Sequence, residues 1–428
     1  MRLTVCAVLL CLLAGTATAA DYRAGTEDYL EQLRRLQPGD RLLLESGDYL
    51  KGLPLHHLSG QAGQPIVIEA ANPAVPPRFI ARPRANTVSL VDARHLIVRH
   101  LELDGRNVPV DAVKAEGHSR YADFITLEYL HIHDHAASQQ NVGISTKCPA
   151  FGWVVRNNRI ERVGTGMYFG DSDGTDPFVA AVIEDNHVSD TLGYSLQIKH
   201  QLVRPVGMPE LEKSHDTLIR RNVFSKEGAL TGPHPRPNVL LGHFPREGAG
   251  MDDRYLVYRN VFHQNPVEAL LQGEGNLLVF ANLFVNRHGD AIHIQPHNDV
   301  PKIVYVFNNT VLSKGEGIVI RNHEPPPWPQ RIFANAVFAS VPLTGGQATG
   351  NLLGSYDEAA LYLRAPHKQA LSEMDVAPRH TLRYSDIQPW PALPVPPAGL
   401  DGIPLVPGEI GAFSATAEGR LNWPGLRP

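Results

Sequence analysis

A weak repeat runs through the middle of the chain and limits the possible fold more than any other feature of the sequence. Its first arm reads apolar-apolar-x-x-Asn-x-apolar, as in "VVRNNRI", "LIRRNVF" and "IFANAVF". The asparagines that mark the copies are Asn158, Asn186, Asn222, Asn260, Asn282, Asn309 and Asn335. Two earlier copies, "IVRHLEL" and "TLEYLHI", carry His100 and Tyr129 at the same place, and successive marks lie 22 to 38 residues apart. A period in this range indicates a solenoid.

A second arm follows most of the marks and often opens on glycine, as in "GISTK", "GMYFG" and "GYSLQIKH". Two short strands per period, rich in β-branched and aliphatic residues, describe one rung of a parallel β-helix. An asparagine can turn the corner in left-handed geometry and bond its side chain to the next rung's backbone. A solenoid of alternating strands and helices is the alternative, but the segments between the strands lack helical periodicity. We therefore predict an all-β, single-stranded parallel β-helix of about nine or more rungs.

The two ends of a solenoid must be covered. At the front, Thr26 is placed to cap a short amphipathic helix, "EDYLEQLRRL", in which Leu30, Leu33 and Leu36 share a face. At the back, the repeat fades into the Pro-rich stretch "PWPALPVPPAGLDGIPLVPGEIGAF". We predict a cap with the first strands over residues 21–81, the β-helix over 82–340, and a tail packed along it over 341–428.

The first twenty residues have the pattern of a signal peptide. Arg2 precedes the apolar run "LTVCAVLLCLLAG", and the small residues "TATAA" follow, with the cut expected after Ala19 or Ala20. No later stretch reaches the roughly 18 apolar residues of a membrane helix. We expect an exported chain, periplasmic or secreted, that acts as a monomer. Cys148, the cysteine left after the leader, is interpreted as a small buried apolar residue. The formal net charge of −5 argues against a nucleic-acid partner.

The front of the chain resembles a known family. The segment "LQPGDRLLLESGDYLKGLPLHHLSGQAGQPIVIEA" contains a Pro-Gly-Asp turn at 38–40, a Gly-Asp-Tyr turn at 47–49 and a Gly-Gln-Pro-Ile strand at 63–66. It is similar to the start of the exported right-handed parallel β-helix lyases typified by chondroitinase B and the alginate lyases, and of related β-helix C5-epimerases. The match covers the N-terminal cap and the repeat architecture. The resemblance implies an enzyme acting on an acidic, uronate-containing polysaccharide.

The resemblance also implies a catalytic lysine on the groove-facing sheet, an arginine about one rung later, and a Ca²⁺ ion held by Asn and Glu side chains before the lysine. Lys199 matches the lysine by its place at the end of a strand near the middle of the rod. One rung on, "LLGHF" offers His243 in place of the arginine. The sequence departs from the family before the lysine, because Leu192, Tyr194 and Gln197 stand where the glutamates are expected.

Strand parity predicts which side chains face the groove. In segment 194–200, Leu196 and Ile198 must point into the rod, so Gln197 and Lys199 point outward, and His200 faces inward or lies in the turn. We expect Lys199 to be the base that removes the proton on C5, and Arg204 is a neighbouring cation able to lower the pKa of Lys199. The candidate catalytic residues are therefore Lys199 and His243, and the candidate substrate-binding residues are Tyr168, Gln197, Arg204, Gln272, His293, Gln295 and Arg321. The alternative is that these side chains only solvate the face of a sheet.

Two segments are candidate metal sites. The loop "DSDGTD" offers Asp171, Asp173 and Asp176 around a glycine turn, which suits Ca²⁺, although such a run is also typical of a plain turn. The strand "HIHDH" is predicted to carry His131, His133 and His135 on one face, which could hold a transition metal, but it has no clear fourth ligand.

Three functions compete. The leading one is a lyase acting on an acidic polysaccharide by β-elimination, or a C5-epimerase using the same site. A hydrolase needs two or three carboxylates in the groove, and the strands named above supply basic and amide groups instead. A non-catalytic glycan-binding protein would be expected to have a groove lined with aromatic residues. The sequence offers few candidates for such a lining, namely Tyr168 and Trp328.

Overall fold

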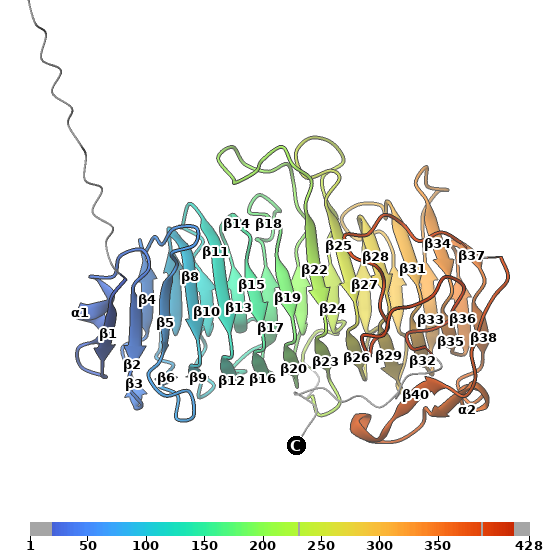
Figure 1. Ribbon diagram of the computed structural model, residues 1–428, viewed down its shortest axis with the longest axis horizontal. Coiled ribbons are helices and arrows are strands. Elements are labelled where there is room, and N and C mark those ends of the chain that lie inside the picture. The colour runs from blue at the N-terminus through green and yellow to red at the C-terminus, as the bar shows by residue number, and fades with distance from the viewer. Residues whose placement is uncertain (1–18, 230–231, 387, 415–428) are drawn as a thin grey trace, which may run out of the picture.

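The computed structural model describes residues 19–229, 232–386 and 388–414, which form a rod of stacked rungs in three long parallel sheets (Figure 1). The predicted right-handed parallel β-helix is confirmed. In the described part of the chain the only helices are α1 (Tyr29–Leu33), α2 (Ala359–Tyr362) and the 3₁₀ turn η1 (Leu371–Glu373), so the strand-helix solenoid is excluded. Residues 1–18 of the predicted leader lie outside the described residues. None of the described helices has the length and apolarity that crossing a membrane would take.

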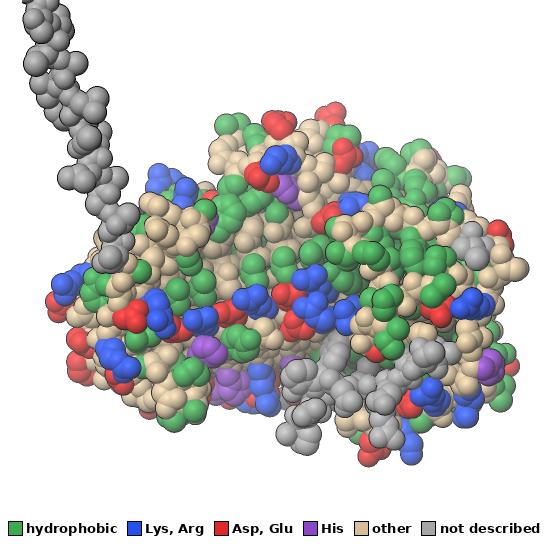
Figure 2. All heavy atoms as spheres, viewed as in Figure 1, with side chains coloured by type: hydrophobic (Ala, Val, Ile, Leu, Met, Phe, Trp, Pro, Cys, Tyr) green, Lys and Arg blue, Asp and Glu red, His purple; other side chains and the backbone are tan. Residues whose placement is uncertain are grey.

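Sheet 1 carries the first strand of each rung. Its strands are β1 (Asp21–Ala24), β2 (Arg41–Leu44), β5 (Ile66–Ala70), β8 (Ala93–Arg99), β11 (Ala122–Glu128), β15 (Val154–Arg156), β19 (Val182–Glu184), β22 (Asp216–Arg220), β25 (Arg254–Tyr258), β28 (Leu277–Phe280), β31 (Val304–Phe307), β34 (Gln330–Phe333) and β37 (Gln347–Thr349), with β14 (Ala150–Phe151) and β18 (Phe178–Val179) at its side. Positively and negatively charged side chains alternate along the rod on the outer face of this sheet, seen as blue and red groups in Figure 2. Glu128, for example, is buried between Arg99 and Arg156 from the two adjoining rungs.

From β8 on, sheet 2 follows sheet 1 after a two-residue corner. Its strands are β3 (Asp48–Tyr49), β6 (Arg78–Ile80), β9 (Glu102–Asp104), β12 (His131–His135), β16 (Arg159–Val163), β20 (His187–Ser189), β23 (Val223–Ser225), β26 (Val261–His263), β29 (Leu283–Asn286), β32 (Thr310–Ser313), β35 (Ala336–Phe338) and β38 (Leu352–Gly354). The rungs therefore continue to Gly354, beyond the expected boundary at residue 340.

Sheet 3 closes each rung and carries the pocket described below. Its strands are β4 (Leu53–His56), β7 (Val88–Val91), β10 (Val113–Ala115), β13 (Val142–Thr146), β17 (Thr165–Phe169), β21 (Leu196–Ile198), β24 (Val239–Leu241), β27 (Leu271–Gly273), β30 (Ile292–Ile294), β33 (Glu316–Ile320) and β36 (Val341–Thr344). Every pairing within it is parallel, so side chains at one register position form a column along the rod.

The repeat asparagines stack in a buried ladder at the corner between sheets 1 and 2. The Nδ2 of Asn222 donates to Oδ1 of Asn260 at 3.0 Å and to the carbonyl of Ile183 at 2.9 Å, and Asn260 repeats the pattern with Asn282. The predicted stacked corners are thus confirmed. The backbone detail was wrong, because the residue before each asparagine takes the positive φ: Arg221 has φ +55°. His100 and Tyr129 occupy that preceding position, and their rings stack at 4.8 Å.

Both ends are covered. The front helix α1 is shorter than predicted, and its N-cap is Asp28, not Thr26, although Leu33 and Leu36 are buried as expected. The Pro-rich tail packs along the rod, with Asn308 Nδ2 donating to the carbonyl of Glu409 at 2.7 Å. The remaining strands β39 (Leu363–Ala365) and β40 (Asp375–Pro378) form a small antiparallel pair in the C-terminal region.

Candidate active site

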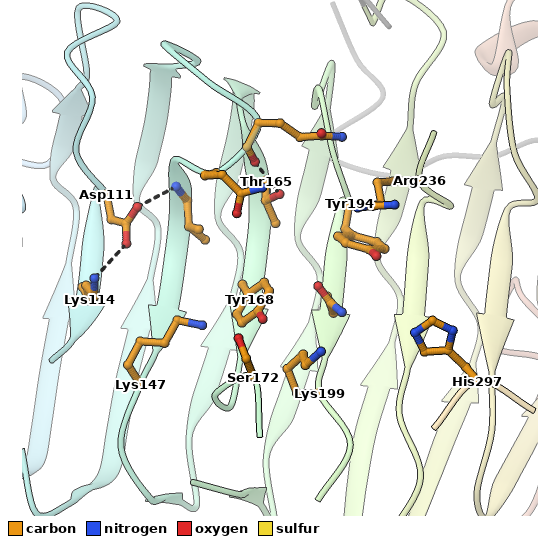
Figure 3. A pocket seen from close by; sticks show the side chains of 14 residues that line it. Asp111, Lys114, Lys147, Thr165, Tyr168, Ser172, Tyr194, Lys199, Arg236 and His297 are labelled. Carbon is orange, nitrogen blue, oxygen red and sulfur yellow. Dashed lines mark hydrogen bonds and ion pairs between the residues drawn. The ribbon is translucent and has the colours of Figure 1, made fainter. Parts of the chain in front are cut away.

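A pocket of about 580 Å³ opens on the outer face of sheet 3 near the middle of the rod (Figure 3). Its lining is rich in cations and amides and contains a single carboxylate. The lining residues are Asp111, Lys114, Gln139, Gln140, Val142, Lys147, Thr165, Tyr168, Ser172, Tyr194, Gln197, Lys199, Arg236 and His297.

The strand containing Lys199 has the predicted parity. Leu196 and Ile198 of β21 are buried in the core, while Gln197 and Lys199 line the pocket. Tyr168 of β17 is the register partner of Gln197 and stands beside it on the preceding rung. The structure thus brings together three of the predicted site residues: Tyr168, Gln197 and Lys199.

Lys147 is the main residue of the pocket that sequence reasoning missed. It follows β13, and its Nζ lies 3.4 Å from the centre of the Tyr168 ring and donates to the carbonyl of Gly170 at 3.1 Å. Burial, together with the charge of Lys114, lowers the pKa of Lys147 to about 8. The aromatic face and the Gly170 carbonyl act in the opposite sense, because they favour the ammonium form.

Gly170 explains why two lysines can share this pocket. Lys147 and Lys199 follow β13 and β21 at the same register position, and Gly170 follows β17, the strand between them. A glycine there leaves the middle rung without a side chain between the two lysines, and a Cβ in its place would lie 3.3 Å from Lys199 Cβ. The backbones of the two lysines lie about 9–10 Å apart, because β13 and β21 are separated by two strand spacings of about 4.8 Å each. Burial also lowers the pKa of Lys199.

A second set of side chains lines the rim. The Arg236 guanidinium lies 5.5 Å from the centre of the Tyr194 ring. Asp111 accepts the backbone N–H of Val142 at 2.9 Å and lies 3.6 Å from Lys114. Burial raises the pKa of Asp111, which makes its charged form less favourable and limits how far it offsets the surrounding cations.

Tyr168 is partly buried in the middle of the pocket. Burial raises the pKa of Tyr168 above its usual value, so the phenol stays protonated at neutral pH. The Tyr168 ring packs against the Lys147 amine on one side, and Gln197 is its register partner on the next rung. Figure 3 shows Tyr168 between Lys147 and Lys199, with Ser172 beneath it.

Several predicted residues lie outside this pocket. Gln272, His293, Gln295 and Arg321 face outward on later rungs of the same sheet, where Arg321 donates to the Gln295 side chain at 3.3 Å. His243 is buried, with its Nδ1 placed 3.0 Å from the carbonyl of Phe244, and it does not line the pocket.

The prediction for Arg204 is corrected. Its side chain is only 2% exposed and forms an ion pair with the buried Asp253, and it donates to the carbonyls of Leu211 and Lys213. Because this guanidinium satisfies a buried carboxylate and two loop carbonyls, it stabilises the loop and cannot contact a substrate in the groove.

The aspartate loop has the hydrogen bonds of a turn. Asp171 Oδ1 accepts the N–H groups of Gly174 and Asp176, and Asp173 Oδ1 accepts the N–H of Thr175. In the described part of the chain the carboxylates of Asp171, Asp173 and Asp176 do not converge as a ligand set. Burial and the two neighbouring aspartates raise the pKa of Asp176 to about 6. The Ca²⁺ prediction stays a prediction.

The expected histidine face is wrong. Asp134 adopts φ +57° within β12, which breaks the alternation of the strand, so His135 is fully buried and points away from His131 and His133. His131 lies 3.1 Å from Glu161, and His133 lies 2.7 Å from Asp134.

Cys148 is a buried free thiol, as the sequence indicated. Burial raises its pKa to about 12, which leaves it protonated and unreactive.

The comparisons with known proteins concern the fold. No protein-family model matches the chain, and no curated protein sequence matches it either. Among solved structures, it resembles the PL6 family alginate lyase AlyGC, solved as a point mutant, with a TM-score of 0.52 at 12% identity over 78% of this chain and 51% of that chain. The chain thus spans about half the length of that enzyme. Alginate lyase from Paenibacillus sp. str. FPU-7 (TM-score 0.40, 13% identity, 78% of this chain and 99% of that chain) and pectate lyase Pel9A (0.44, 14%, 84% and 86%) are also similar. At 12% identity the likeness to AlyGC shows the fold alone, a parallel β-helix.

Proposed function

We propose that the protein is a carbohydrate-active enzyme that cleaves an acidic, uronate-containing polysaccharide by β-elimination. The observation that carries the proposal is the charge of the pocket, where Lys114, Lys147, Lys199 and Arg236 surround a single carboxylate, Asp111. Such a lining favours an anionic ligand, and the parallel rungs offer subsites at about the repeat of a sugar chain.

The two central lysines take different roles in this proposal. Lys199 pairs with the uronate carboxylate, and neutralising that group acidifies the proton on C5. Lys147 removes this proton, because its lowered pKa of about 8 gives it a neutral fraction near physiological pH. In this proposal the sugar ring lies in the pocket that both amines line.

The electrons of the broken C5–H bond form a C4–C5 double bond as the C4–O bond to the leaving sugar breaks. The leaving oxygen needs a proton, and the Tyr168 hydroxyl supplies it. The phenol is suited to the task because burial keeps it protonated and because its ring adjoins the base. Proton removal and proton delivery are thereby assigned to neighbouring side chains on consecutive rungs.

A C5-epimerase is the second candidate, because return of a proton to the opposite face of C5 without cleavage uses the same carboxylate pairing and base. Hydrolysis in this pocket is not favoured, since Asp111 is its single carboxylate and a glycosidase needs two. A non-catalytic binding protein remains the outcome if no product forms. The predicted leader over residues 1–20 supports export to a compartment in which the protein can meet such polymers. We expect the chain to act as a monomer.

One assay tests the proposal. The purified chain is incubated with alginate, polygalacturonate and glycosaminoglycans, and the absorbance of the unsaturated uronate product is followed. A rise on at least one acidic polymer, with none on a neutral β-glucan, is expected. Epimerisation would instead change the uronate composition, seen by NMR, without any absorbance rise. Binding to a polymer with neither change would overturn the enzymatic proposal.

A further inference from the structure

A second cluster of chemically active groups lies farther along sheet 3, outside the pocket. It consists of His293 on β30, Glu316 at the start of β33, and Asp290 in the turn before β30. The strand β30 is three rungs from β21, which places the cluster about 14 Å along the rod from the rung of Lys199. The proposed β-elimination uses none of these three side chains.

His293 is buried and lacks a hydrogen bond at one ring nitrogen. The residue is 7% exposed, and its Nε2 makes no hydrogen bond to any described residue. This atom nevertheless points between two carboxylates, 3.4 Å from Asp290 Oδ2 and 3.4 Å from Glu316 Oε2. A buried polar atom of this kind requires a partner.

The separations fit a metal ion better than a hydrogen bond. An imidazolium donating to a carboxylate is expected at about 2.7–2.9 Å. Around a tetrahedral Zn²⁺, with Zn–N and Zn–O bonds of about 2.0–2.2 Å, neighbouring ligand atoms lie about 3.4 Å apart. Both distances from Nε2 therefore match the edge of such a tetrahedron. The imidazole also occupies the gap between the carboxylates, which excludes a sugar from the position that a glycosidase would need.

The surrounding groups hold the carboxylates in place. Asp290 Oδ1 accepts the backbone N–H of Glu316 at 2.7 Å, which leaves Oδ2 facing His293. Gly315 allows this approach, because a Cβ there would lie 2.1 Å from Asp290 Oδ1. Glu316 Oε2 accepts a hydrogen bond from Arg321 at 2.7 Å. Such outer contacts orient metal ligands and sustain metal affinity.

We propose that Asp290 Oδ2, His293 Nε2 and Glu316 Oε2 bind a divalent transition metal of the Zn²⁺ class. One imidazole with two carboxylates is a mixed donor set that suits such ions. Three protein ligands leave a fourth position for water or for an oxygen of a bound sugar. The site stands whether or not the pocket at Lys147 is catalytic.

A similar cluster in the molecule is already satisfied and provides a control. In the group of Asp104, His133 and Asp134, the ring of His133 lies 2.7 Å from Asp134 at Nδ1 and 3.3 Å from Glu102 at Nε2. Asp134 is also paired with Arg162 at 2.8 Å. Both ring nitrogens of His133 have partners, unlike Nε2 of His293, so we assign no metal there.

The test is calorimetric titration of the chelator-treated full chain with ZnCl₂, without polysaccharide. One zinc equivalent should bind, and His293→Ala should weaken binding by at least about 100-fold, since loss of an outer contact alone costs 10–100-fold. Glu316→Gln, which conserves shape, should weaken it in the same direction, whereas His133→Ala should bind like the parent. Co²⁺ in the parent should give the visible spectrum of a tetrahedral site, and His293→Ala should lose it.

Melting curves in chelator establish that each variant is folded, and Glu316→Gln decides the matter if His293→Ala does not fold. Failure of the parent to bind zinc would overturn the proposal and leave His293 in contact with two carboxylates only. Equal binding by the parent and both site variants would mean adventitious surface zinc and would overturn it too. Loss of binding only in His133→Ala would move the metal to the other cluster.

Discussion

Lys147 Nζ lies 3.4 Å from the centre of the Tyr168 ring, with the two side chains on consecutive rungs of one sheet. The contact joins an amine whose pKa is lowered to about 8 to a phenol whose pKa is raised. Burial causes both shifts, since it disfavours the ammonium ion and the phenolate alike. Because the pKa of Lys147 is about 8, most of its amine is protonated at neutral pH, and the neutral fraction able to act as the proposed base grows as the pH approaches that value.

Exchange of each central lysine for arginine separates the two proposed roles. Arginine keeps the positive charge but cannot lose a proton in a protein. Lys147→Arg should therefore lower kcat by at least about 100-fold, the scale of losing a general base. Lys199→Arg should keep most of the activity, whereas Lys199→Ala should lose about 100-fold or more, because the uronate carboxylate is then unpaired. Initial rates on the polymer identified in the panel provide the measurement.

Melting temperatures control this comparison, because neither lysine is part of the core. Lys199→Ala should stay within about 0.5 kcal/mol of the parent in stability, as expected for a surface substitution. The reverse pattern, with Lys147→Arg active and Lys199→Arg inactive, would assign the base to Lys199.

The pH dependence of kcat follows from the same assignment. Because Lys147 must be neutral to accept a proton and its pKa is about 8, kcat should rise about tenfold per pH unit below pH 8 and level off above it. The rate should fall again only where Tyr168 ionises, which is above the usual range for tyrosine. A profile that is flat between pH 6 and 9 would contradict the lysine base.

Lys147 also predicts a pH dependence of stability. Its folded pKa of about 8 lies below the roughly 10.4 of an unfolded lysine. Between these values the unfolded chain binds more protons, so the free energy of unfolding contributed by Lys147 rises with pH from about 8 to about 10.4. Lys147→Met should remove this rise, which denaturant melts of the parent and the variant at pH 8 and pH 10 would detect as a smaller difference in the variant.

The stacking of the rungs could be predicted because their signals are local and repeated. Each asparagine mark sits between apolar residues whose spacing fixes a corner, and Asn222 and Asn260 lie where the repeat placed them. The parity of Lys199 was equally accessible, because Leu196 and Ile198 must be buried. Asn351, which ends the ladder, was missed because its copy "TGNLLG" lacks the apolar residues before the mark.

The composition of the pocket was harder to predict, because it depends on register between rungs of unequal length. Lys147 was visible at the end of "GISTK", but only the pairing through Gly170 brings it into one site with Lys199. The prediction for Arg204 was wrong for a different reason, because its guanidinium is paired with Asp253, which lies 49 residues away in sequence. The kink at Asp134 that buries His135 likewise has no signal in an alternating strand pattern.

Loss of one asparagine from the ladder should be costly. Asn260 is fully buried, and Asn260→Ala would remove the acceptor of the Asn222 N–H and a donor to the carbonyl of Ile219. The free energy of unfolding should fall by about 2–4 kcal/mol, as expected for buried polar groups left unpaired. Asn351→Ala, at the partly exposed end of the ladder, should cost less than Asn260→Ala. Urea denaturation of the two variants provides the measurement, and equal losses would contradict a buried ladder.

Gly170 should be required for the pocket as well as for the turn. It has φ +85°, and a Cβ there would lie 3.3 Å from Lys199 Cβ. Gly63 is a matched control, because it has φ +77° and a Cβ there would meet nothing within 4 Å. Both alanine variants should lose about 1–2 kcal/mol of stability through the left-handed backbone. Only Gly170→Ala should also lower kcat, because its methyl group displaces Lys199. Parallel melts and rates test this, and equal activity of the two variants would mean that no sugar occupies the space above Gly170.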